Sequence, residues 1–175
     1  MGGAIAGCRP LKDRSVFSVI ILVLIFSNLP DIDLLFGFTA GSPNRYHHMW
    51  THSILFCVAA GLLSGFILTR FSVLNGLTTG LMLSAVLLSH LALDMFTRDS
   101  SFPYGMQLFW PFSGRYYIGK WTPLPDVYKT SVNASFFRAV FSMHNLKTAG
   151  IEALVFTPFL VLALIRPKKR KRIET

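Results

Sequence analysis

Residues 15–33 read SVFSVIILVLIFSNLPDID, an apolar run that ends in two aspartates. The run carries no charge before Asp31, and its length is close to the ~20 apolar residues that cross a bilayer as a helix. Pro30 disfavours a helical conformation of the residue before it, so we expect a break between the apolar run and the acids. Asp31 and Asp33 would then lie together at a membrane surface.

Three further blocks of the chain are almost free of charge, and the composition fits a membrane protein. Hydrophobic residues make up 52% and charged residues 14% of the 175 residues, against ~25% charged in soluble domains. A soluble protein with very apolar core helices is the alternative, but a chain of this length could not bury four such helices on all sides. We therefore expect an all-α integral membrane helical bundle that forms a single domain over residues 1–175. The expected spans are residues 15–30, 53–69, 71–94 and 148–165, followed by a basic tail at 166–175.

The lysines and arginines give the expected orientation. Four spans place both termini on one side of the membrane, and the positive-inside rule makes that side cytoplasmic. The basic residues on that side are Arg9, Lys12, Arg14, Arg70 and the tail RPKKRKR. A basic tail can bind nucleic acid, but one that follows an apolar run is more typical of a cytoplasmic helix end, so we expect membrane lipids and no nucleic acid as partners. Residues 30–52 and 97–147 then lie on the outer face of a bacterial or archaeal cell membrane.

Two features of the chain predict how the spans are packed and covered. Glycine pairs four residues apart occur at Gly61/Gly65 and Gly76/Gly80, and such pairs let helix backbones approach closely. Only a short turn separates the two expected spans, so the contact should form within the chain. Residues 97–147 are rich in aromatic residues, and from Ser131 to Lys147 the apolar spacing is helical. We interpret this extramembrane segment as a lid or lipid-facing rim, with an aromatic belt without a substrate role as the alternative.

Histidines and aspartates gather in three motifs. In HLALD, His90 and Asp94 are four residues apart and therefore share one helix face. They could bind one metal ion, or the acid could orient the imidazole. Ionisable groups at the end of a span are costly and indicate function.

The segment HHMWTHS, residues 47–53, contains three imidazoles. If the segment is helical, His48 and His52 share a face; if it is a loop that enters a helix near Thr51, His47 can turn back as well. Thr51 or Ser53 could cap the following helix. Histidines at a membrane interface without a ligand role are the alternative.

The third motif is DID, in which Asp31 and Asp33 point the same way if the chain is extended. Such a pair can also face water, or bind Mg or Mn together with a nucleotide sugar. Together the three motifs supply nitrogen and oxygen ligands, and no pair of cysteines joins them. This set favours zinc, with manganese or a small cluster of ions as the alternatives. Because motifs for a protein nucleophile are missing, hydrolysis by metal-activated water is the favoured chemistry.

These motifs, LPDID, HHMWTHSIL and LSHLALDMFT followed by WPF, resemble those of the YdjM-like family of membrane-bound metal-dependent hydrolases. The resemblance covers about residues 28–112 in order and with similar spacing. It implies metal ligation by the residues that match the family motifs, namely Asp31, Asp33, His47, His52, His90 and Asp94. Kinship with zinc-dependent phospholipases C and single-strand nucleases would imply phosphoester hydrolysis.

The chain departs from the family pattern at two places. His48 stands where the family usually has arginine, so the resemblance favours His47 as the ligand and makes His48 an outer or phosphate-facing group. A histidine that family members often carry near the N-terminus is missing from MGGAIAG. Either a ligand is lost or the true start lies upstream, and the number of ions therefore stays open.

The sequence thus predicts a metal-dependent hydrolase that acts on a phosphoester, and a small-molecule or lipid substrate fits the setting. Asp31 or Asp33 would also serve as the general base, and Arg98 or Arg115 could hold a phosphate or anchor the interface. The first alternative is a membrane metal or ion transporter, which would place acids deeper within its spans. The second is a non-catalytic metal-binding membrane protein.

Overall fold

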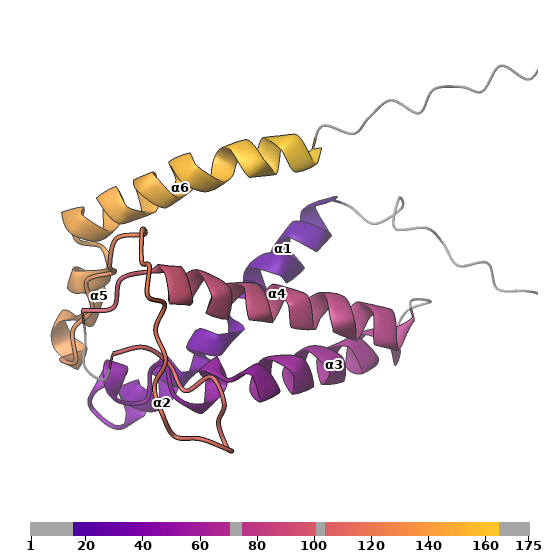
Figure 1. The fold of residues 1–175 in the computed structure, drawn as a ribbon, viewed down its shortest axis with the longest axis horizontal. Coiled ribbons are helices and arrows are strands. Elements are labelled where there is room, and N and C mark those ends of the chain that lie inside the picture. Colours follow the sequence, from indigo (N-terminus) through magenta and orange to yellow (C-terminus); the bar gives the residue numbers. More distant parts are fainter. Residues whose placement is uncertain (1–15, 71–74, 101–103, 165–175) are drawn as a thin grey trace, which may run out of the picture.

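The computed structural model describes residues 16–70, 75–100 and 104–164 (Figure 1). Over these residues the protein is helical and has no strand, which confirms the all-α prediction. Two isolated β-bridges, Thr97 with Leu124 and Met106 with Tyr117, fasten the long loop between the helices. Arg9, Lys12, Arg14, Cys8 and the basic tail lie outside the described residues.

The first apolar run breaks where the sequence predicts it. Helix α1 (Val16–Ser27) is followed by a 3-10 turn, η2 (Leu29–Ile32), and by the short helix α2 (Asp33–Thr39). The Asn28 amide donates to the Leu24 carbonyl at 2.8 Å and so satisfies a terminal acceptor of α1. The chain bends by 54° at this break. Asp31 and Asp33 do not lie in an extended segment, the condition under which their side chains would point the same way, because both lie on helical turns.

Helices α3 (Ile54–Arg70) and α4 (Gly76–Phe96) form an antiparallel hairpin, which is the most extensive packing in the described fold (Figure 1). Gly65 lies directly against the Gly80 backbone, and Gly61 lies against Ser84, so that side chains at either glycine would clash. The prediction that the glycine pairs pack within the chain is confirmed. Ser53 accepts a hydrogen bond from the Phe56 N–H at 3.1 Å, which confirms it as a cap of α3.

The prediction of four spans is wrong for the described part of the chain. Helix α4 alone is long and apolar enough to cross a membrane, and the bent pair of α1 with residues 29–39 makes at most a second span. Helix α3 has 17 residues and a length of about 26 Å, less than the ~30 Å of a bilayer core. The fourth expected span falls in α6 (Met143–Leu164), whose side chains are described only in part.

The hairpin nevertheless presents a surface suited to lipid. Large apolar side chains on the outer faces of both helices are more than half exposed, and contiguous exposed apolar surface marks contact with a membrane or another protein. These side chains are Leu63, Phe66, Ile67, Leu77, Leu81 and Met82.

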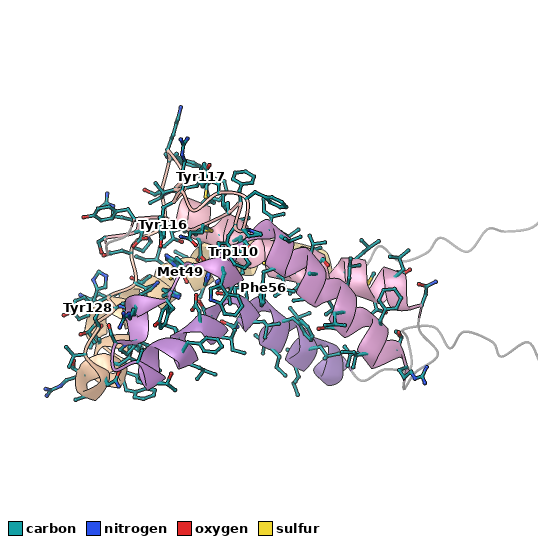
Figure 2. The ribbon with its side chains drawn as sticks, turned by 90° about the horizontal axis from the view of Figure 1, so that it is seen from below. Met49, Phe56, Trp110, Tyr116, Tyr117 and Tyr128 are labelled. Carbon is teal, nitrogen blue, oxygen red and sulfur yellow. The ribbon has the colours of Figure 1, made fainter. Side chains whose placement is uncertain are left out.

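The loop between α4 and α5 (Asn133–Val140) closes over one end of the hairpin. Met106 joins the buried core of Cys57, Leu87 and Leu91, and the Ile54 N–H donates to the Leu108 carbonyl at 3.0 Å. Figure 2 shows Trp110 and Phe56 where this loop meets the start of α3, with Tyr116 and Tyr117 farther along the loop. The loop therefore forms one wall of the region that holds the histidines.

The helix expected between Ser131 and Lys147 is present in two pieces, α5 and the start of α6, with a break at Phe141 and Ser142. The Asn145 side chain fixes this break, since it donates to the Ala139 carbonyl and bonds both backbone groups of Tyr128. These bonds tie the long loop to the two C-terminal helices.

Candidate metal centre

Asp33 anchors one half of a His/Asp cluster. It is fully buried at the start of α2. The Thr51 hydroxyl and the His48 backbone N–H donate to it at 2.8 and 3.1 Å. The Nδ1 atoms of His47 and His52 lie 3.0 and 3.1 Å from its two oxygens. One carboxylate therefore fixes the orientation of two imidazoles.

Four side-chain atoms form the other half of the cluster. His90 Nε2 lies 3.3 Å from Asp94 Oδ2 and 3.6 Å from Asp31 Oδ1. His52 Nε2 lies 3.7 Å from the same Asp94 oxygen and 3.5 Å from the same Asp31 oxygen. A zinc ion at about 2.1 Å from four tetrahedral ligands separates those ligands by about 3.4 Å. The four distances are close to this separation, Asp31, His52 and His90 form a set that could hold a metal ion, and Asp94 lies beside two of them.

Three of these four atoms have no hydrogen-bond partner within the described structure. They are the buried atoms His52 Nε2, His90 Nε2 and Asp94 Oδ2. Buried polar atoms are seldom left without a partner. If Nδ1 of His52 donates to Asp33, 3.1 Å away, then Nε2 carries a lone pair next to Asp31 and Asp94, as in carboxylate–histidine–metal arrangements. Burial alone would lower the pKa of His52, but the Asp31 and Asp33 carboxylates raise it. The cluster could therefore hold a cation.

His47 connects the cluster to a lysine on the long loop. Its Nε2 lies 2.7 Å from Nζ of Lys129. Burial, and then the Lys129 ammonium, lower the pKa of His47 to about 3. The imidazole is therefore neutral, donates through Nδ1 to Asp33 and accepts through Nε2 from Lys129. His47 also lies 3.8 Å from Asp31, and Asp31, Asp33 and His47 form a second, overlapping set of possible ligands.

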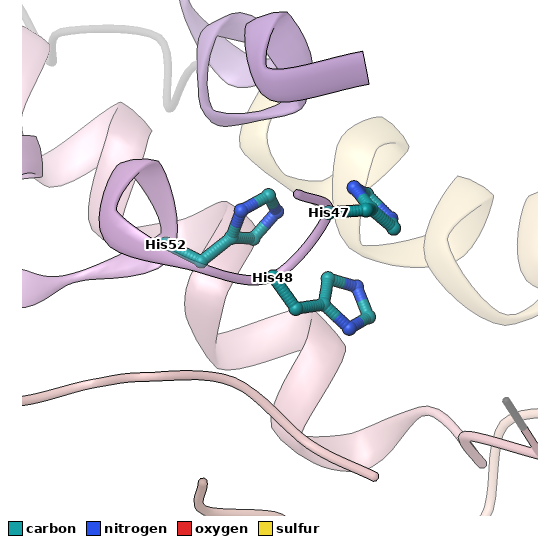
Figure 3. Close-up of side chains that lie close together, drawn as sticks. All are labelled: His47, His48 and His52. Atoms are coloured by element: carbon teal, nitrogen blue, oxygen red, sulfur yellow. The ribbon is translucent and has the colours of Figure 1, made fainter. Parts of the chain in front are cut away.

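His48 lies beside the other two imidazoles but has a different partner (Figure 3). Its backbone is left-handed, with φ of 65°, so the hypothesis that a helix places His48 and His52 on one face is wrong. Its ring is 4.0 Å from that of His47, and its Nδ1 lies 3.5 Å from Asp99. Burial lowers the pKa of His48, although Asp99 opposes the shift. The three histidines together are a further set that could bind a metal.

A pocket of about 460 Å³ borders the cluster. Its charged and polar lining comes from the cluster, from the helix ends and from Lys129, and its apolar lining comes from α2, α4, α5 and the long loop. The residues that line it are Asn28, Asp31, Leu34, His47, His48, His90, Leu93, Asp94, Thr97, Leu124, Val127, Lys129, Phe136, Val140 and Glu152. The pocket gives a substrate access to Asp31, His90 and Asp94.

The structure brings all six residues proposed as ligands into one cluster, although their ligation of a metal stays a prediction. Arg98 lines a small pocket that adjoins His48 and Lys129. Arg115 is exposed and does not line either pocket.

Sequence reasoning missed three residues of the site. Thr51, considered only as a helix cap, bonds Asp33, and Asp99 faces His48. Lys129 is 82 residues from the histidine that it contacts, and no local pattern marks it.

Comparisons with known proteins identify the family of the chain. The family model described as YdjM inner membrane protein matches residues 1–171, so the chain belongs to the YdjM family of inner membrane proteins. The resemblance read from the three motifs is thereby confirmed. The chain is also 32% identical over 117 residues to the inner membrane protein YbcI of Escherichia coli K12, a match that spans 66% of this chain and 64% of that relative. No solved structure matches the chain.

Proposed function

We propose that this inner membrane protein is a metal-dependent hydrolase of phosphoesters. The observation that supports the proposal most is the arrangement of Asp31, His52, His90 and Asp94. Their neighbouring nitrogen and oxygen atoms lie 3.3–3.7 Å apart, and three of these atoms lack a hydrogen-bond partner. A divalent ion bound there, zinc or manganese, would acidify a water molecule and polarise a phosphoryl oxygen.

The two aspartates of LPDID take different roles in this proposal. Asp33 is fully buried and already holds Thr51, His48 and two imidazoles, so it is poorly suited to accept a further proton. The Asp31 side chain is 31% exposed and lines the pocket. We therefore assign Asp31 as the general base that accepts the proton of the attacking water, and Asp33 as the residue that orients His47 and His52. Asp31, Asp33 and His47 are a set that could hold a second ion, and the number of ions stays open.

The proposal includes the location of the site on the outer face of the inner membrane. Arg70 ends α3 at one end of the hairpin, and Asp94 lies near the opposite end of α4 (Figure 1). Because arginine and lysine favour the cytoplasmic side, the cluster would face outward. A cysteine at Ser42 should then react with an impermeant thiol reagent in intact cells, and protection of this position would reverse the orientation.

The experiment that tests the activity compares metal-loaded and chelator-treated protein purified in detergent. Turnover of a panel of phosphomonoesters and phosphodiesters should vanish on chelation and return with zinc. His90→Ala should show neither turnover nor recovery, whereas His144→Ala, which removes a histidine paired with Asp126 outside the cluster, should behave as wild type. Turnover that survives both chelation and His90→Ala would contradict the proposal. Metal binding without any turnover would favour transport or a non-catalytic role.

A further inference from the structure

We propose that the pocket beside the cluster binds an amphiphilic phosphate, with Lys129 as the residue that holds its anionic oxygens. This inference rests on the proposed function and names its substrate class. Four observations support it: the hydrogen bonds that position Lys129, the basic side chain that lines a pocket with it, the apolar side chains of the main pocket, and the continuity of that pocket with the outer surface of α4.

Lys129 is positioned at the edge of the cluster by two hydrogen bonds in series. Asp33 holds Nδ1 of His47 at 3.0 Å, and Nε2 of His47 lies 2.7 Å from the Lys129 ammonium. An ammonium group has three N–H donors, so two remain after the bond to the imidazole. Among the described residues, Lys129 forms no ion pair with a carboxylate. The ammonium therefore lies in the pocket with donors available to an anion.

A second cationic side chain lies next to Lys129. The small pocket of about 50 Å³ that adjoins the main one is lined by Lys129, Arg98 and His48 and by the hydroxyl residues Thr97 and Ser100. The carboxylates Asp94 and Asp99 and the apolar Val127 complete its lining. Cations and hydroxyls of this kind bind phosphate oxygens through charge-assisted hydrogen bonds. The anionic group of a ligand would thus lie between the cations Lys129 and Arg98 and an ion held by Asp31, His90 and Asp94.

The remaining lining of the pocket is mainly apolar, with Asn28 and Glu152 of α6 as its polar members. Leu34 of α2, Leu93 of α4, Phe136 and Val140 of α5, and Val127 of the loop line it. Leu93 is 41% exposed and Phe96, one turn further along α4, is 47% exposed, so the apolar wall continues onto the outer surface of the span. A hydrocarbon chain bound along this wall would be continuous with the lipid around α4.

A binding experiment on zinc-loaded protein in detergent tests the inference without relying on turnover. Calorimetric titration with hexyl phosphate and with inorganic phosphate is performed on wild type, Lys129→Gln and Lys129→Arg, with Lys120→Gln as a control for an exposed lysine on the same loop. Zinc content is measured in each preparation.

We expect hexyl phosphate to bind wild type at least about tenfold more tightly than inorganic phosphate, because apolar burial adds to the anion contact. Lys129→Gln should weaken hexyl phosphate binding by about 10- to 100-fold, Lys129→Arg should restore most of the loss, and Lys120→Gln should have no effect. All four proteins should hold the same amount of zinc.

Each other outcome identifies which step has failed. If wild type binds hexyl phosphate and inorganic phosphate with equal affinity, the proposal of an amphiphilic ligand is refuted and free phosphate is the ligand. Equal affinity of wild type and Lys129→Gln, with zinc retained, would overturn the role of Lys129 and leave the proposed function standing. Loss of zinc in Lys129→Gln would also overturn it, since the lysine would then act on the metal centre. Absence of zinc from wild type would refute the proposed function itself.

Discussion

The two halves of the His/Asp cluster differ in how completely the protein itself satisfies them. In the half around Asp33, both carboxylate oxygens have hydrogen-bond partners within 3.1 Å. The same is true of both ring nitrogens of His47 and of the Thr51 hydroxyl. In the half formed by Asp31, His52, His90 and Asp94, three buried atoms have none. The complete network around Asp33 can act as a scaffold, whereas our proposal is that an ion completes the network of Asp31, His52, His90 and Asp94. The predictions below alter one half at a time.

The largest effect is expected where the scaffold is broken. Asp33→Ala leaves four donors without their acceptor in a fully buried position, so the metal-free protein should lose about 3–5 kcal/mol of stability and also fail to bind zinc. Thermal unfolding in detergent measures the first effect and elemental analysis the second. Asp126→Ala is the control, because Asp126 belongs to a largely exposed pair with His144 that contributes at most about 1 kcal/mol. Equal destabilisation by the two variants would refute the scaffold role.

Removal of a proposed metal ligand should reduce zinc binding strongly while it lowers the stability of the metal-free protein only a little. In His90→Ala the zinc affinity should fall by more than the ~10–100-fold that an outer partner contributes, because a ligand itself is lost. The metal-free protein should be destabilised less than by Asp33→Ala, since Nε2 of His90 has no hydrogen-bond partner. Zinc titration and unfolding of the same preparations decide this. A destabilisation as large as that of Asp33→Ala would show that the two halves are one structural network.

Thr51→Val should slightly lower both the stability of the protein and its affinity for zinc. The substitution keeps the side-chain shape and removes the hydroxyl that donates to Asp33 at 2.8 Å. We expect a loss of about 1–3 kcal/mol in stability and about a tenfold weaker zinc affinity. Thr39→Val removes an exposed hydroxyl bond on α2 and should change the stability by no more than about 0.5 kcal/mol. If both variants match wild type, Thr51 does not support the carboxylate.

The smallest effect on the metal is expected at His48. Asparagine tolerates the left-handed backbone at this position, so His48→Asn removes the imidazole without straining the turn. His48 is not one of the four proposed ligands Asp31, His52, His90 and Asp94, and it faces Asp99. The zinc content should therefore equal that of wild type, and the zinc affinity should fall by about tenfold at most. Loss of zinc would assign His48 as a ligand.

The sequence predicted the cluster better than it predicted the membrane topology. Asp31, His52 and His90 were found because each motif places its residues close to a helix end, and helix ends that lie on one side of a bundle meet. The glycine pairs predicted the α3–α4 hairpin for a similarly local reason, since only small residues permit that approach. The span count failed because hydropathy counts apolar residues and does not register the bend at Asn28 or the short length of α3.

The contacts that sequence could not reveal join distant parts of the chain. Lys129 meets His47 only because the long loop folds back over the hairpin, through bonds such as that from the Gln107 N–H to the His48 carbonyl. Likewise, Asp31 and Asp33 have different environments because of the 3-10 turn, which buries Asp33 and leaves Asp31 beside the pocket. In an extended chain, the two side chains would instead point the same way.

X-ray absorption at the zinc edge of the reloaded wild-type protein tests the central claim most directly. The account predicts zinc with four nitrogen or oxygen ligands at about 2.0–2.2 Å, two of them with the scattering pattern of imidazole, from His52 and His90. The same spectrum should disappear in His90→Ala and persist in His144→Ala. A ligand sphere that contains sulfur at about 2.3 Å, or wild-type protein that retains no zinc after reloading, would contradict the assignment of Asp31, His52, His90 and Asp94 as the metal site.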